Sequence, residues 1–230
     1  MLSMNHIATP PLENGDKLTR PVFERRYQAT PRIKAELIGG SVYMPAALRF
    51  ESHAKPHALI ISWLGVYYAE TPGVHLGDNA TIRLDLDNEP QPDALLRIDE
   101  KAGGQSHITT DDYLEGAPEL IVEVAASSAS YDLHEKKKVY RRHGVKEYLV
   151  WRIYDRCLDW FILKDGDYIK LTPNSDGIIQ SQTFPGLVLH VSAMIEGHLA
   201  KVLTILKNQG LQTQEHQTFV EYLSKEKIQS

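Results

Sequence analysis

Two carboxylates lie within an apolar strand-like segment, where ionised groups are costly to bury. Residues 119–126 read ELIVEVAA, and Glu119 and Glu123 are its polar members. Removing a carboxylate from water costs several kcal/mol unless it is protonated, paired or bound to a metal. We therefore interpret Glu123 as a candidate site residue. The alternative is a strand at the sheet edge, or a salt bridge to Arg or Lys on the next element.

A second candidate carboxylate begins the preceding apolar segment. Asp93 follows Pro92 and opens the run DALLRI at residues 93–98. Neighbouring strands can bring two carboxylates together, and such oxygen ligands suit a hard divalent cation such as Mg²⁺. Taken alone, an aspartate at this position is more often a turn residue than a metal ligand.

Three consecutive lysines follow in a segment with helical signals. Residues 132–143 are predicted to form a helix, with a capping box at Asp132 and Glu135 and with Gly144 closing the far end. At 100° per residue, Leu133 and Tyr140 define its inward line. Lys136 and Lys137 flank that line, whereas Lys138 points away. A lysine beside the packed face could serve a metal-and-water site; the alternative is an ordinary solvated basic face.

Positive charge continues along this helix although the protein is acidic overall. The formal net charge is −5, which excludes a globally basic coat protein, so contact with phosphates needs a local patch. Arg141, Arg142, His143 and Lys146 extend the lysine run. Of the whole cluster, Lys137, Arg141 and Arg142 are the candidate nucleic-acid-binding residues.

Other catalytic arrangements are absent or weak in the sequence. It contains no Gly-x-Gly-x-x-Gly, no Walker-type loop and no Gly-x-Ser-x-Gly elbow. His53 and His57 have metal-pair spacing, but Pro56 suggests that the helix starts after His53, which favours surface polarity there. Glu119 and Glu123 could form an acid/base pair, yet four strand positions span about 13 Å, against about 5–9.5 Å in paired glycosidase carboxylates.

The supporting elements predict a mixed α/β architecture. We expect a hairpin around Gly39-Gly40, a helix from Pro56 to about residue 70, and strands near 82–86, 93–98 and 119–126. Residues 99–117 are predicted to be a long loop. After the 132–143 helix come strands at 147–153, 158–164, 168–171 and 187–191, and then C-terminal helices around Leu199–Leu206 and Phe219–Leu223.

Length and composition predict the domain organisation and the cellular compartment. The 230 residues, 42% of them hydrophobic, suit one domain with appendages. We expect a loose leader at 1–30, the main domain at 31–195 and a helical extension at 196–230. The single cysteine, Cys157, suits a reducing cytoplasm, where we expect the protein to reside. The longest apolar stretch, residues 58–69, is too short to span a bilayer, so no membrane association is expected.

Several ordered motifs across residues 33–195 resemble one known group, the Uma-two family within the PD-(D/E)xK nuclease superfamily. They are ELIGG at 36–40, QPD at 91–93, PELIVEV at 118–124, GVKEY at 144–148 and FPGL at 184–187, with Ser128, Asp132, Glu135, Lys136 and Tyr140 between them. The chain departs from the pattern at three positions. Ala125 occupies the usual lysine position, Glu119 replaces a usual Asp, and Ser41 replaces a frequent Glu.

The resemblance implies a restriction-endonuclease-like mixed central sheet flanked by helices. It also implies a metal-dependent endonuclease that hydrolyses DNA phosphodiesters. Asp93 and Glu123 would hold Mg²⁺ (or Mn²⁺), and Lys136, supplied from the helix in place of Ala125, would orient the attacking water. A homodimer would let two sites address two strands. The alternative is a catalytically degenerate nuclease fold that acts as a nucleic-acid-binding or assembly module.

Overall fold

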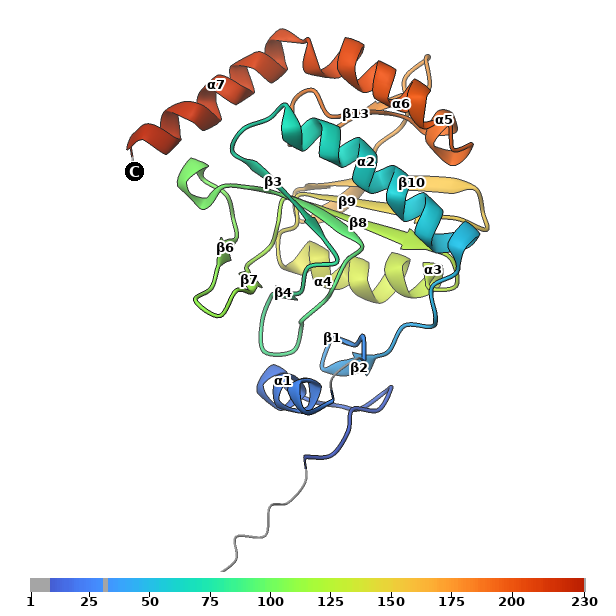
Figure 1. Cartoon of the computed structure of the whole chain (residues 1–230), viewed down its shortest axis with the longest axis vertical. Helices are drawn as coiled ribbons and strands as arrows, with labels where there is room; N and C mark the ends of the chain where they lie inside the picture. The colour runs from blue at the N-terminus through green and yellow to red at the C-terminus, as the bar shows by residue number, and fades with distance from the viewer. Residues whose placement is uncertain (1–8, 31–32, 230) are drawn as a thin grey trace, which may run out of the picture.

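A mixed six-stranded sheet forms the centre of the computed structural model, which describes residues 9–30 and 33–229 (Figure 1). The strand order is β11-β10-β9-β8-β5-β3. Strands β8 and β9 are parallel, and the other neighbours are antiparallel. The strands are β3 (Val74–Asp78), β5 (Ala94–Ile98), β8 (Leu120–Ala125), β9 (Glu147–Arg152), β10 (Cys157–Lys164) and β11 (Asp167–Lys170). The predicted mixed α/β fold is confirmed.

Helices cover both faces of this sheet. The longer helix α2 (Lys55–Ala69) lies on one face, where Trp63 packs edge to face against Trp160 of β10. On the other face lie α3 (Ala129–Tyr131), a π-helical turn η3 (Asp132–Lys136) and α4 (Lys137–Arg142). Tyr140 of α4 packs there against Tyr148 of β9. The helical segment α3–η3–α4 is the crossover that parallel strands β8 and β9 require.

Alternation along the strands decides which face receives each candidate residue. In β8, Leu120, Val122 and Val124 belong to the core beneath α2, whereas Ile121 and Ala125 belong to the core beneath α4. Glu123 has the parity of the second set, because strand side chains alternate between faces. It therefore faces the helix that carries the three lysines.

The N-terminal part has a small core of its own. Helix α1 (Arg20–Ala29) and the hairpin β1 (Glu36–Ile38) and β2 (Ser41–Tyr43) enclose Phe23 and Val42. Gly39 and Gly40 form the predicted two-residue turn with φ of +55° and +70°, which glycine adopts without strain. The expectation of a loose leader over 1–30 missed α1, which the burial of Phe23 and an ion pair between Glu24 and Arg83 hold against the body. Residues 1–8 lie outside the described part.

Two predicted segments differ from the structure. The alternating apolar and polar residues at 82–86 predict one strand, but only β4 (Ile82–Arg83) forms. The chain turns directly afterwards, where the Leu84 amide donates to the Asn88 carbonyl. The predicted loop 99–117 contains two short strands, β6 (His107–Ile108) and β7 (Leu114–Glu115), which join β4 in a small sheet.

The C-terminal region is helical, as predicted. The pair β12 (Ile178–Gln180) and β13 (Val188–His190) leads into α5 (Val191–Ile195), α6 (Leu199–Ile205), the π-helical η4 (Leu206–Leu211) and α7 (Gln214–Gln229). Helix α6 packs on α2, and α7 reaches across the top of the molecule to the 3₁₀ turn η2 (Glu100–Ala102) (Figure 1). Within residues 9–30 and 33–229, every helix is too short or too polar to cross a membrane.

Candidate active site

Asp93 and Glu123 lie where the pairing of β5 and β8 ends, Asp93 immediately before β5 and Glu123 within β8. The register of β5 and β8 runs from Leu96–Leu120 to Ala94–Val122, and the next position on each strand is Asp93 and Glu123. A hydrogen bond fixes Asp93, whose Oδ2 accepts from the Val124 amide at 2.7 Å. The structure thus brings together the two carboxylates that the sequence predicted as neighbours.

Lys136 reaches the same place from the helical crossover. Its Nζ lies 3.0 Å from Glu123 Oε1 and 2.9 Å from Glu36 Oε1. Asp132, one helical turn earlier, has Oδ1 at 3.8 Å from the same nitrogen. Tyr140 also donates to Glu123 Oε1 at 3.0 Å. All three predicted site residues, Asp93, Glu123 and Lys136, therefore line one cluster.

Two further carboxylates were not predicted as site residues. Glu36 belongs to the ELIGG hairpin motif, and its Oε1 also accepts from the Gln91 amide at 2.6 Å. Asp132 was assigned to a helix cap, but helical backbone begins at Ala129, so Asp132 lies inside the helical segment. The sequence signal that could have identified Asp132 is its spacing: it lies four residues before Lys136 and therefore on the same helical face.

His53 was also misjudged. Helical backbone starts at Phe50 with a π-helical turn η1 (Phe50–Ala54) that runs into α2, so Pro56 does not exclude His53 from the helix. Its Nε2 lies 3.3 Å from Asp93 Oδ1, and its Nδ1 lies 3.2 Å from the Val124 carbonyl. His57 instead contacts the Asp93 carbonyl and Asp78, so the two histidines do not converge on a shared point.

The electrostatics of the cluster follow from burial and pairing. Burial raises the pKa of Glu123 well above its ordinary value, although Lys136 opposes this. Burial opposes the charged form of Lys136, but the carboxylates of Glu123, Glu36 and Asp132 outweigh it and hold its pKa well above the usual range. Burial likewise raises the pKa of Asp132 to about 6. The ammonium is therefore charged and lies among three carboxyl groups.

The pKa of Asp93 moves the other way. Burial would raise it, but hydrogen bonds from His53 and the Val124 amide lower it. The hydrogen bond to Asp93 raises the pKa of His53, and both of its ring nitrogens face acceptors. The pair thus favours an ionised Asp93 carboxylate and the protonated form of the His53 imidazole.

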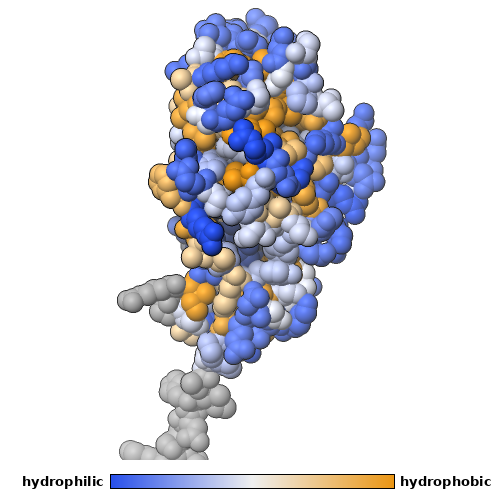
Figure 2. Space-filling view, turned by 90° about the vertical axis from the view of Figure 1, so that its right-hand side faces the viewer, coloured by the Kyte–Doolittle hydropathy of each residue, from blue (hydrophilic) through white to orange (hydrophobic). Residues whose placement is uncertain are grey.

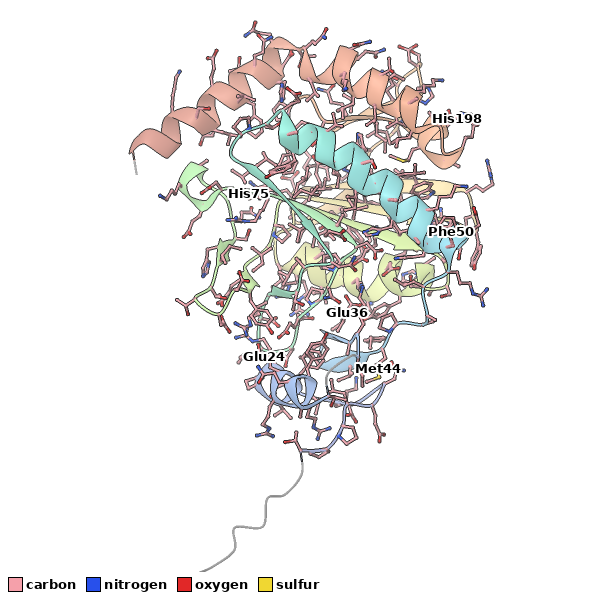
Figure 3. The ribbon with its side chains drawn as sticks, in the orientation of Figure 1. Glu24, Glu36, Met44, Phe50, His75 and His198 are labelled. Carbon is pink, nitrogen blue, oxygen red and sulfur yellow. The ribbon has the colours of Figure 1, made fainter. Side chains whose placement is uncertain are left out.

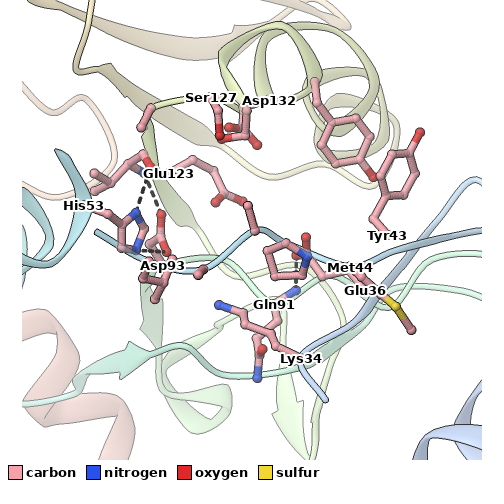
Figure 4. A pocket seen from close by; sticks show the side chains of 18 of the residues that line it. Lys34, Glu36, Tyr43, Met44, His53, Gln91, Asp93, Glu123, Ser127 and Asp132 are labelled. Atoms are coloured by element: carbon pink, nitrogen blue, oxygen red, sulfur yellow. Dashed lines mark hydrogen bonds and ion pairs between the residues drawn. The ribbon is translucent and has the colours of Figure 1, made fainter. Parts of the chain in front are cut away.

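The cluster forms the wall of a cavity of about 640 Å³ (Figure 4). Strand β8, the hairpin, the 44–53 segment and the start of the crossover all contribute to it. Beyond the acids and Lys136, its lining includes Lys34, Tyr43, Leu48, Arg49, Ser127, Tyr131 and Tyr154. The volume is sufficient for a nucleotide-sized group.

The donor set fits a partly hydrated divalent cation rather than a complete protein cage. Within residues 9–30 and 33–229, no three His, Cys, Asp or Glu side chains converge as a metal-ligand group. Mg²⁺ is usually held by one or two carboxylates, with waters and substrate phosphate completing its octahedron. Asp93 and Glu123, which both line the cavity, are the residues that could supply such a pair.

The remaining basic candidates lie outside the cavity lining. Lys137 Nζ lies 3.5 Å from the centroid of the Phe161 ring, and Arg141 donates to the Gly166 carbonyl and to Asp167. Arg142 is exposed. Lys138 is exposed too and pairs with Glu135, as helical geometry predicted.

Glu119 has a structural task. Its two carboxylate oxygens accept from the backbone amides of Ile98 and Gln105, at 2.8 and 2.9 Å, and the residue is fully buried. It therefore holds the start of the 99–117 segment against β5. An acid/base pair of Glu119 and Glu123 has no accessible Glu119, and we discard that hypothesis.

Comparisons with known proteins agree with this architecture. A family model described as "Uma2: Putative restriction endonuclease" matches residues 21–192. The fold is similar to the crystal structure of a "putative nuclease belonging to DUF820" from Anabaena variabilis ATCC 29413, with a TM-score of 0.62 and 11% identity. The match covers 78% of this chain and 98% of the other, and at this identity it shows the fold alone. No curated protein matches the chain.

Proposed function

Since the chain belongs to the Uma2 family of restriction-endonuclease-like proteins, we propose that it is a Mg²⁺-dependent (or Mn²⁺-dependent) endonuclease that hydrolyses DNA phosphodiester bonds. Family membership and fold support a nuclease function. The observation that carries the finer proposal is the position of Asp93 and Glu123 where the pairing of β5 and β8 ends, with Lys136 Nζ 3.0 Å from Glu123. In metal-assisted hydrolysis carboxylates hold the ion, and a nearby cationic donor can stabilise the negative charge that develops at the phosphate.

Asp93 and Glu123 would hold the divalent ion. When bound, the ion supplies Lewis-acid activation of the phosphate and a nucleophilic water near neutral pH. The hydrogen bonds from His53 and the Val124 amide keep the Asp93 carboxylate oriented and ionised. Tyr140 restrains Glu123 through its hydroxyl.

Lys136 would act as a charged donor rather than as a base. Its pKa lies well above the usual range, because three carboxylates surround it, so it holds its proton at neutral pH. An ammonium in this position can orient water and stabilise negative charge that develops at the pentavalent phosphorus. Its ion pairs with Glu36 and Asp132 fix it beside Glu123.

Lys137, Arg141 and Arg142 would bind flanking phosphates from the same helix. Their place outside the cavity suits interactions that strengthen binding without touching the reacting atoms. Such interactions would make the affinity depend on salt.

The test is incubation of supercoiled plasmid with the protein and Mg²⁺ or Mn²⁺, with EDTA as a control. We expect nicked or linear DNA only with metal, and loss of cleavage in Glu123→Gln. Lys138→Met, which changes an exposed lysine on the same helix, is the matched control and should cleave normally. DNA binding without cleavage under every condition would favour the degenerate binding module instead.

A further inference from the structure

Three large apolar side chains are exposed around the mouth of the active-site cavity. Leu48 is 58% exposed, Phe50 is 70% exposed and Tyr154 is 64% exposed. Leu48 and Tyr154 line the cavity, whereas Phe50 is not among the lining residues and follows the lining residue Arg49 in the chain. We call these three residues the apolar rim.

The rim is assembled from two distant parts of the chain. Phe50 opens η1, the turn that also carries His53, and Leu48 lies two residues before it; Figure 3 shows Phe50 at this end of the helix. Tyr154 lies in the connection between β9 and β10. The same side of the molecule faces the viewer in Figure 2, where apolar and polar side chains intermix. The fold thus gathers these side chains at one opening.

Exposed large apolar side chains elsewhere on the surface are not grouped around this cavity. The other strongly exposed large apolar side chains among the described residues are Tyr68, Leu86, Ile108, Ile169 and Tyr222, and none of them lines the cavity or adjoins a lining residue in the sequence. Single exposed apolar residues are ordinary, but a group at a concave site marks a ligand-binding surface.

Positive charge accompanies the apolar rim. Lys34 and Arg49 line the same cavity. Arg49 is exposed and makes no ion pair with another described residue. Exposed aromatic faces beside basic groups are the combination that single-stranded nucleic acids bind, because bases stack on the rings while phosphates meet the cations.

The burial of the catalytic cluster points to the same substrate. The side chains of Asp93 and Glu123 are only 9% and 6% exposed, and that of Lys136 is 5% exposed. A scissile phosphate must therefore enter the cavity past the rim. In an intact duplex the adjacent bases are paired and stacked, so they cannot meet Phe50 or Tyr154.

From these observations we infer that the cavity takes a single-stranded DNA segment, whose bases beside the scissile phosphate stack on Phe50 and Tyr154 while Leu48 packs against a neighbouring base. This inference rests on the proposed nuclease function and specifies its substrate class.

The test measures binding in EDTA, so that it does not depend on cleavage. Fluorescence anisotropy compares a labelled mixed-sequence oligonucleotide as a single strand and as a duplex. We expect the single strand to bind at least about tenfold more tightly, and Phe50→Ala and Tyr154→Ala each to weaken it at least about fivefold. Phe50→Trp should retain the affinity, because stacking needs a ring and not phenylalanine itself.

The matched control is Ile169→Ala, which shortens a side chain that is 50% exposed away from the cavity and should leave affinity unchanged. Duplex affinity equal to or above single-strand affinity would overturn the inference. So would a Phe50→Ala protein that binds like Ile169→Ala. If binding shows the expected pattern but no DNA is cut with metal, the nuclease proposal fails and the binding mode stands. If duplex DNA is cut equally by wild type and Phe50→Ala, the nuclease proposal stands and this inference fails.

Discussion

Replacing Lys136 by methionine removes the ammonium that contacts Glu36, Glu123 and Asp132 while keeping much of the side-chain volume. At about 3 Å and an effective dielectric constant near 20, each close ion pair supplies about 5 kcal/mol of Coulomb attraction, much of it offset by desolvation. Removing one partner of a buried ion pair costs about 3–5 kcal/mol net. We therefore expect the melting temperature to fall by about 10 °C.

The same change should reduce catalysis more than substrate binding. A lysine that orients water or stabilises the pentavalent centre acts in the transition state, so kcat should fall about 100-fold or more with little change in KM. Steady-state cleavage of a labelled oligonucleotide, measured below the melting temperature of the variant, separates this effect from unfolding.

The neighbouring lysines provide matched controls. Lys138→Met breaks only an exposed pair with Glu135, which is worth less than about 1 kcal/mol, and should leave both readouts nearly unchanged. Lys137→Met removes a cation from the face of the Phe161 ring, outside the cavity, and should retain kcat. If Lys136→Met cleaves as fast as wild type while Lys137→Met is inactive, the catalytic lysine is misassigned. If neither slows cleavage, the role of lysine in the mechanism is wrong.

Three further predictions concern metal, salt and pH. Glu123→Gln should lose Mn²⁺ binding in calorimetry, because an amide is a much weaker ligand than a carboxylate for a hard divalent cation; equal Mn²⁺ affinity would exclude Glu123 as a ligand. Neutralising Arg141 and Arg142 together should flatten the dependence of log affinity for DNA on log salt, by about one unit for each phosphate that the protein no longer neutralises, and an unchanged slope would contradict their binding to phosphate. Burial and the neighbouring Glu24 raise the pKa of Glu89 from 4.5 to about 8. The folded state therefore binds more protons than the unfolded state between these values, so the free energy of unfolding should fall as pH rises from about 4.5 to 8. Glu89→Gln should flatten this decline in urea titrations, and an identical decline in the variant would contradict the assignment.

Local pattern was sufficient for most of the fold. Burial explains the apolar runs at 93–98 and 119–126. The need for positive φ explains the Gly39-Gly40 turn, and helix termination explains Gly144. The helix over 132–143 was placed well, and its geometry separated Lys138 from Lys136 before any tertiary contact was known. These features are readable because neighbouring residues in the chain determine them.

The carboxylates at Asp93 and Glu123 were readable for a different reason. An ionised group in an apolar run conflicts with the rest of its strand, and such conflicts concentrate at functional sites. The sequence therefore indicated the two acids and, through the family resemblance, Lys136. It also determined the family, since ordered motifs over residues 33–195 are a linear property of the chain.

Only the tertiary structure determines which residues surround Asp93, Glu123 and Lys136. Glu36 lies 100 positions before Lys136, and the docking of the hairpin brings the two within 2.9 Å. His53 reaches Asp93 because η1 extends α2 by one turn, which Pro56 concealed. The apolar rim joins Phe50 and Tyr154 from separate segments. No local pattern encodes such proximities, because they arise from the packing of whole elements, whereas periodicity records only which face of one element is buried.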